Sequence, residues 1–148
     1  MVAAPMMTLK DFESMLTRSL SAVHGELAIG LDKVGQLAEA NAAELPGHYQ
    51  PGWAPLAEST LADKEKQGFP VPSPLKRTGE MAESYRKDVD VAELEMVIGS
   101  ESKIALYQEM GTVHIPPRPV CSTALKNSLP FATDVFGEIA VKLLTGKK

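Results

Sequence analysis

The sequence predicts an α+β fold, in which a long N-terminal helix and a C-terminal helix pack on a small antiparallel sheet with Pro-rich loops between them. Three observations carry this prediction: apolar residues recur with helical spacing at both ends of the chain, they alternate with polar residues near position 90, and prolines gather in between. The length of 148 residues and the hydrophobic content of 44% indicate one domain, residues 1–148, with a core of its own.

The first helix is predicted over residues 8–43. Apolar side chains recur at steps of three and four from Leu9 to Leu37, which places them on one helical face. Thr8 followed by Asp11 offers an N-cap hydroxyl and an early carboxylate, and Pro46-Gly47 ends the helix. Such a stripe must cover something, either the sheet of the same chain or a neighbouring subunit.

Three glycines, at positions 25, 30 and 35, lie inside this helix. Each costs roughly 1 kcal/mol relative to alanine. The pattern therefore indicates that packing outweighs helix propensity here, or that close contact is needed at these positions.

The middle of the chain is predicted to be rich in loops. Residues 45–56 and 68–74 each carry three prolines, and a short polar helix is expected between them over residues 58–67, with a brief helical segment at residues 77–84. The segment Asp63-Lys64-Glu65-Lys66 is expected to be a solvent-exposed face of mixed charge.

Alternation of apolar and polar residues predicts two strands, one over residues 87–91 and one over residues 94–98. The short connection near Ala92 indicates a hairpin, and Gly99 closes the second strand. Because an isolated hairpin is only marginally stable in water, it must pack on a helix or pair with a strand from elsewhere in the chain.

The last third of the chain begins with a predicted helix at residues 103–110, which Gly111 ends. Three prolines keep residues 113–120 extended. Apolar residues from Leu125 to Leu143 then follow a helical period, and Pro130 either kinks this helix or begins a second one. The two terminal helices are expected to pack on the sheet.

Composition and charge exclude several classes of protein. The net charge is -4 with a pI near 5.4, and lysines and arginines are scattered, which argues against tight, sequence-specific binding of nucleic acid. No apolar stretch approaches a membrane span and no signal peptide is evident, so neither a membrane partner nor export is expected. The single cysteine, Cys121, permits no intrachain disulfide and no cysteine-based zinc site, and is expected to be a small buried hydrophobe.

No pattern of catalytic residues is evident. His24, His48 and His114 have no metal-ligand spacing, and nucleophile motifs, phosphate-binding glycine loops and dinucleotide fingerprints are absent from the sequence. Cys121 and His114 form a conceivable nucleophile pair, but no orienting group or oxyanion site accompanies them. We therefore expect no enzyme, no cofactor and no metal site.

Five short motifs follow one another between residues 53 and 119. They are Trp53-Ala54-Pro55-Leu56, which Thr60 and Lys64 follow, then Pro74-Leu75 with Thr78-Gly79, then Ile98-Gly99, then Tyr107 to Thr112, and finally Ile115-Pro116-Pro117-Arg118-Pro119. This order resembles the phage virion-morphogenesis and tail-completion proteins over a little under half of the chain. Two features depart from the family pattern: Val120 stands where members often place an aromatic residue, and Pro130 interrupts the terminal helix.

The motifs provide the candidate interface residues, which are Trp53, Pro55, Leu56, Thr60, Lys64, Pro74, Leu75, Thr78, Gly79, Tyr107, Glu109, Gly111, Thr112, Pro116, Arg118 and Pro119. We expect Trp53 to anchor its loop to the core, with insertion into a partner as the alternative. Thr78-Gly79 and Gly111-Thr112 are expected to form turns. Arg118 is expected to hold a carboxylate, either Glu109 or one on the next subunit.

The resemblance implies a non-enzymatic subunit that assembles head to tail into a ring, a hexamer in the family pattern, at the phage neck or tail end. Its implied partners are copies of itself and other neck, connector or tail-tube proteins. The implied location is the virion, with the host cytoplasm during assembly. The alternatives are a tail terminator that stops tube polymerisation, a small assembly-associated hydrolase, and a DNA-binding regulator, which the acidic pI disfavours.

Overall fold

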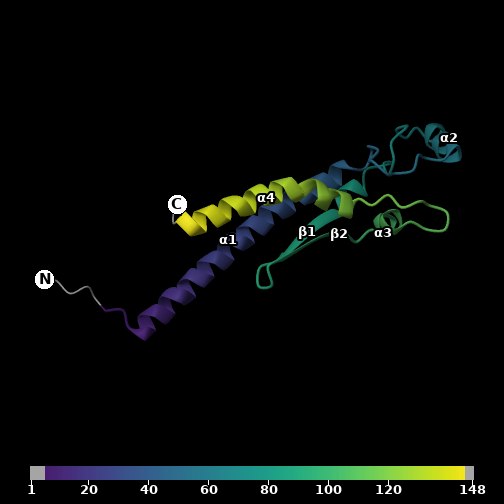
Figure 1. The fold of residues 1–148 in the computed structure, drawn as a ribbon. Coiled ribbons are helices and arrows are strands. Elements are labelled where there is room, and N and C mark those ends of the chain that lie inside the picture. Colours follow the sequence, from purple (N-terminus) through teal and green to yellow (C-terminus); the bar gives the residue numbers. More distant parts are fainter. Residues whose placement is uncertain (1–5, 146–148) are drawn as a thin grey trace.

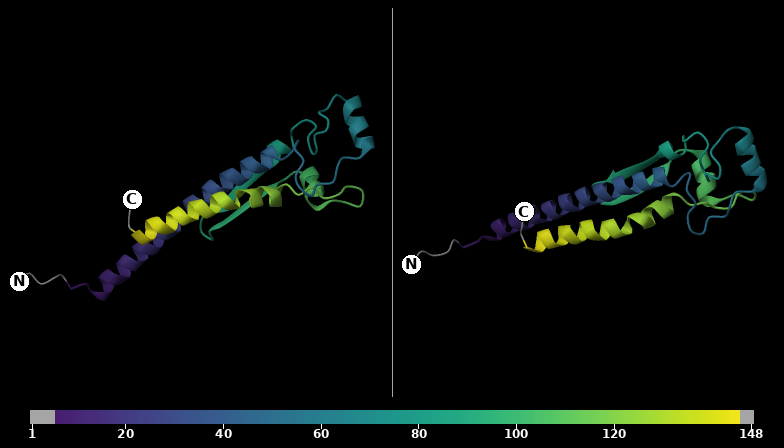
Figure 2. Two further views of the ribbon diagram at one scale, coloured as in Figure 1. Left: turned by 45° about the horizontal axis from the view of Figure 1, so that its top comes forward. Right: turned by 90° about the horizontal axis from the view of Figure 1, so that it is seen from above.

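The computed structural model describes residues 6–145 as an elongated molecule, seen from three sides in Figures 1 and 2. Two long helices lie side by side and antiparallel, a hairpin packs on the first of them, and two short helices with their loops form one end. The elements are, in chain order, α1 (Leu9–Glu44), α2 (Glu58–Lys66), the 3₁₀ turn η1 (Ala82–Ser84), β1 (Tyr85–Asp90), β2 (Glu95–Ser100), α3 (Lys103–Met110) and α4 (Cys121–Thr145). The predicted α+β class, with both terminal helices packed on a small antiparallel sheet, is confirmed.

Helix α1 begins where the sequence predicts, at a capping box. The backbone N–H of Asp11 donates to the Thr8 hydroxyl at 3.1 Å, and the N–H of Thr8 donates to the Asp11 carboxylate at 3.0 Å. Two donors that the first helical turn leaves free are thereby satisfied. The helix ends at Glu44, just before Pro46.

The two halves of α1 have different surroundings. Every described residue from Met6 to Ala22 is exposed, whereas the C-terminal half is buried against α4 and the hairpin at Gly30, Val34, Gly35, Ala38 and Ala42. In Figure 1 the purple start of α1 extends past the yellow end of α4. The apolar stripe therefore covers its own chain only in the second half.

Two of the three glycines in α1 are needed for close contact. A Cβ atom at Gly30 would lie 2.7 Å from Cδ1 of Ile139 in α4, and one at Gly35 would lie 3.0 Å from Cδ of Lys87 in β1. At Gly25 no atom lies within 4 Å of that position. Close approach of the helix to its neighbours thus explains Gly30 and Gly35 but not Gly25.

The sheet has two strands in the described part of the chain, so the predicted hairpin packs on α1 and gains no third strand there. Val89 pairs with Met96, and Tyr85 with Ser100. The prediction that Val91 and Leu94 belong to the strands is wrong: they lie in the turn. The Asp90 carboxylate accepts the N–H groups of Ala92 and Glu93 at 2.8 and 3.0 Å, and this side-chain turn ends β1 early.

The predicted helix at residues 77–84 is wrong except for its last turn. Only η1 forms, because Gly79 takes a positive φ of 99° and interrupts any helix that began before it. Gly79 thereby makes the turn that was expected of Thr78-Gly79, and its carbonyl accepts the N–H of Glu83 at 3.1 Å.

Helix α4 runs without interruption through Pro130, which is exposed, so Pro130 does not begin a second helix. The amide of Asn41 in α1 donates to the Ser128 hydroxyl at 2.9 Å and ties the two helices together. The main core lies where α1, the hairpin, α3 and the start of α4 meet, and its buried members are Ala38, Ala42, Leu45, Trp53, Met81, Tyr85, Ile98, Ala105, Val120 and Ala124.

Candidate functional site

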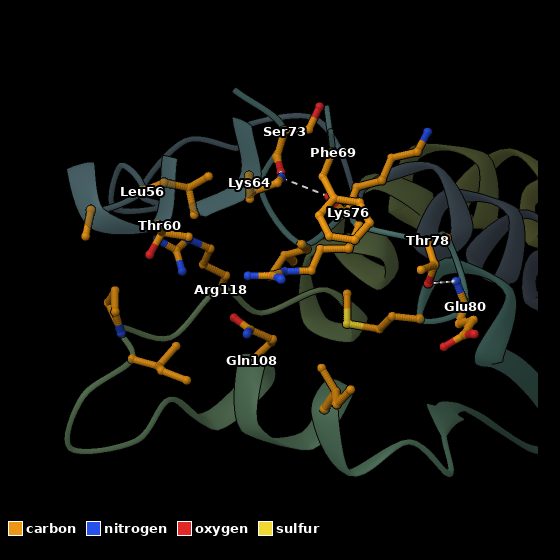
Figure 3. Close-up of a pocket in the computed structure, with 18 of the residues that line it drawn as sticks. Leu56, Thr60, Lys64, Phe69, Ser73, Lys76, Thr78, Glu80, Gln108 and Arg118 are labelled. Atoms are coloured by element: carbon orange, nitrogen blue, oxygen red, sulfur yellow. Dashed lines mark hydrogen bonds between the residues drawn. The ribbon is translucent and has the colours of Figure 1, made fainter. Parts of the chain in front are cut away.

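A cavity of about 1090 Å³ lies at the end of the molecule, between α2 with its following loop and α3 with the 111–118 loop (Figure 3). We call it the α2–α3 cavity. Its apolar lining comes from Leu56, Phe69, Leu75, Met81, Ile104 and Ile115. A space of this size lies at the upper end of the usual range for ligand sites, and it has room for a short peptide segment.

Lys64 reaches the cavity from α2 and is 3% exposed. Its ammonium donates to the carbonyl of Lys76 at 2.8 Å and also to the carbonyl of Ser73. Burial lowers the pKa of Lys64, and the nearby Arg77 lowers it further. The prediction of a wholly exposed, mixed-charge face is wrong for Lys64, because this side chain holds the 73–76 loop.

Arg118 crosses from the opposite side and is 5% exposed. Its Nε and Nη2 donate to the carbonyl of Ala54 at 3.2 and 2.9 Å, and Nη2 donates to the carbonyl of Pro55 at 3.1 Å. The guanidinium therefore holds the motif at residues 53–56 against the motif at residues 115–119. The prediction that Arg118 binds the carboxylate of Glu109 is wrong, because the proline-stiffened segment directs it at a loop that leaves two carbonyls free.

Glu109 instead caps α4. Its carboxylate accepts the N–H groups of Val120, Cys121 and Ser122 at 2.6, 2.9 and 3.2 Å. A carboxylate at a helix N-terminus satisfies free donors and interacts favourably with the helix dipole. This contact joins α3 to the start of α4.

The remaining motif residues divide between core and surface. Trp53 is 9% exposed and lies in the main core, as expected, and Pro74 is fully buried. Tyr107 is exposed, and the Pro119 carbonyl accepts the Thr123 hydroxyl within α4's first turn. Besides Leu56, Lys64, Leu75 and Arg118, the candidates that line the α2–α3 cavity are Pro55, Thr60, Thr78, Gly79 and Pro116.

The turn at Gly111-Thr112 forms as expected. Gly111 has a φ of 73°, and a Cβ there would lie 2.9 Å from the backbone nitrogen of Pro117, so no larger residue fits without movement. The backbone N–H of Thr112 then donates to the carbonyl of Ile115 at 2.8 Å. The loop that closes the cavity is thus folded back on itself.

Gln108 is a cavity residue that the sequence patterns did not single out. Its Oε1 is buried and no described residue donates a hydrogen bond to it. Figure 3 shows Gln108 on the α3 side and Lys64 on the α2 side, with Arg118 between them. The sequence signal that could have identified Gln108 is its spacing from Ile104, because residues four apart lie on the same face of a helix.

The other polar candidates do not converge. Within residues 6–145 no group of His, Cys, Asp and Glu side chains is placed to hold a metal ion. Cys121 is half-buried against the main core, and burial, with the nearby Glu109, raises the pKa of its thiol to about 11. Among the described hydrogen bonds, none joins Cys121 to His114, which is exposed.

No helix in the described part of the chain is long and apolar enough to span a bilayer. Comparisons of the chain with protein-family models, with curated proteins and with solved structures give no match.

Proposed function

We propose that this chain is a non-enzymatic structural subunit of a phage virion, which acts at the head–tail junction or at the tail end. Its action is binding: identical copies form a closed ring, a hexamer by the family resemblance, that docks on neck, connector or tail-tube proteins. The protein then resides in the virion, and in the host cytoplasm during assembly.

One observation carries the proposal. Four of the five motifs that resemble the tail-completion proteins, far apart in sequence, contribute to one unit around the α2–α3 cavity. Arg118 of the last motif holds Ala54 and Pro55 of the first, and Lys64 holds the loop that contains Pro74 and Leu75. A pattern whose members stabilise one another in space is more specific than five short matches taken singly.

The exposed half of α1 also supports a role in assembly. Leu9 and Leu20 are 91% and 69% exposed, and Phe12, Met15 and Leu16 are exposed beside them. A run of large apolar side chains along one uncovered helix is typical of a protein–protein interface. It suits a subunit that is stable alone and buries more surface when it assembles.

The proposal is tested by electron microscopy of lysates from a phage that carries a nonsense codon in this gene, with a plasmid copy of the gene as the control. Filled heads beside finished, unattached tails support joining or completion, and mass spectrometry should find the protein in purified wild-type virions. Overlong tails indicate the terminator role instead. Normal infectious virions from the mutant overturn the proposal.

A further inference from the structure

The turn of the hairpin carries a group of four carboxylates. We call residues 88–95 the hairpin tip; it holds Asp88, Asp90, Glu93 and Glu95 and no cation. All four are exposed, and none of them takes part in an ion pair among the described residues. His24 of α1 contacts the carbonyl of Val91 at 2.6 Å, so the tip is held against α1 in a fixed place.

The α2–α3 cavity has the opposite charge. Four cations and two carboxylates line it, and its two buried charged residues, Lys64 and Arg118, are both cations. Lys64, Arg118 and Lys76 have no carboxylate within ion-pair distance in the described structure; only Arg77 does, paired with Asp63 at 2.7 Å. Buried cations bonded only to carbonyls keep a net charge that a carboxylate would neutralise.

The cavity also has unused hydrogen-bonding capacity. Arg118 uses Nε and Nη2, and no described residue accepts a hydrogen bond from its Nη1. The buried Oε1 of Gln108 lacks a donor. An entering peptide can supply both missing partners, a carboxylate for the cations and a backbone N–H for Gln108.

We propose that the hairpin tip of one copy docks in the α2–α3 cavity of a second copy. The tip presents carboxylates together with the exposed side chain of Val91, and the cavity presents cations together with an apolar lining. Tip and cavity are separate surfaces, so each copy receives one neighbour and docks into another, which is the heterologous contact that a ring requires. This inference rests on the proposed function, in that it names the contact through which the ring forms.

The test compares the wild-type chain with Glu93→Lys/Glu95→Lys by sedimentation velocity across a concentration series at low salt. Glu95 lies opposite Asp90 in the hairpin register, so a lysine there replaces a repulsion by an attraction and the hairpin still folds. Each Glu→Lys substitution raises the net charge by two, so the two together move it from -4 to 0. The electrostatic repulsion between copies of the chain therefore falls. We nevertheless expect self-association at least tenfold weaker.

A second variant, Lys76→Glu, changes the cavity side. Lys76 is exposed and lines the cavity, and only its backbone carbonyl is used by Lys64, so the fold is retained. We expect it to associate at least tenfold more weakly as well. A mixture of the two variants keeps one intact tip and one intact cavity, and should form the 1:1 pairs that neither variant forms alone.

The control is Asp134→Lys/Glu138→Lys, which makes the same charge change on the exposed side of α4, away from the hairpin tip, the cavity and the exposed half of α1, and should associate like the wild type. Wild-type association by the hairpin variant overturns the inference, as does equal weakening in the control. A wild-type chain that stays monomeric also overturns it, while the phage experiment decides separately on the proposed function.

Discussion

In the helical shaft formed by α1 and α4, small residues let apolar surfaces approach, whereas at the cavity end charged side chains bind main-chain carbonyls. Gly30 faces Ile139 directly, and Asn41 with Ser128 supplies a partly buried hydrogen bond between the two helices. At the other end Lys64 and Arg118 each hold a loop by its carbonyl groups. Regular elements satisfy their own backbone, so loops near a core need side chains to do so.

The largest effect is expected when a carbonyl-binding cation of the cavity end is removed. Lys64→Met keeps the length of the side chain but leaves the carbonyls of Ser73 and Lys76 without their donor. We expect a loss of about 3 kcal/mol in the free energy of unfolding, measured by urea denaturation. Lys66→Met, on the exposed side of the same helix, should change it by less than about 0.5 kcal/mol. Equal effects of the two changes would show that the Lys64 contacts contribute little.

In the shaft, two glycine substitutions should have opposite signs. Gly30→Ala brings a methyl group against Ile139 and Phe136, an overpacking cost of about 1–3 kcal/mol that exceeds the gain in helix propensity. Gly25→Ala meets no atom and should stabilise by up to about 1 kcal/mol. Thermal unfolding of both variants measures the difference. Stabilisation by both would mean that α1 and α4 are less closely packed than described.

A smaller effect is expected where the two regions join. Glu109→Gln removes the negative charge from the N-terminus of α4 and leaves one oxygen to accept N–H groups, and should cost about 1 kcal/mol. Urea denaturation followed by circular dichroism measures this loss. Glu138→Gln, an exposed carboxylate inside α4 and away from both of its ends, serves as the control and should be neutral. An unchanged midpoint for both variants would refute the capping role.

The smallest effect concerns a surface contact between α1 and the hairpin. The hydrogen bond from Lys87 lowers the pKa of Asp32 from its ordinary value. A depressed folded-state pKa stabilises the protein above the unfolded pKa, and this stabilisation is lost as the pH falls through the folded value. Asp32→Asn should therefore lower the urea midpoint slightly at pH 7 and leave it unchanged near pH 2. A difference between the chains that persists in acid would exclude this explanation.

Periodicity predicted the shaft and the hairpin well because both obey local rules. The limits of α1 follow from Thr8, Asp11 and Pro46, and those of α3 from Gly111, all of which act within a few residues. The hairpin turn begins earlier than predicted, because the Asp90 side chain accepts a backbone hydrogen bond and so ends the first strand at Asp90. All of these signals act between residues that are close in the sequence.

The cavity end could be predicted only in part. The motifs drew attention to Lys64 and Arg118. Both side chains bind backbone carbonyls, which every residue has, so the sequence carries no signal that identifies these hydrogen-bond partners. Charge patterning suggested an exposed Lys64, because it stands in the mixed-charge run of residues 63–66; Glu65 and Lys66 are exposed, but Lys64 is not. The packing of each loop on a helix depends on tertiary contacts, which sequence patterns over a few residues do not predict.

The antiparallel pairing of α1 with α4 has a consequence for how the chain folds as it is synthesised. Contacts such as Lys142 with Glu26, at 2.6 Å, join residues separated by more than a hundred positions. The apolar face of α1 that α4 covers is therefore made early and stays uncovered until α4 has left the ribosome. A paused or truncated nascent chain that ends before α4 presents that face to chaperones, proteases and other nascent chains.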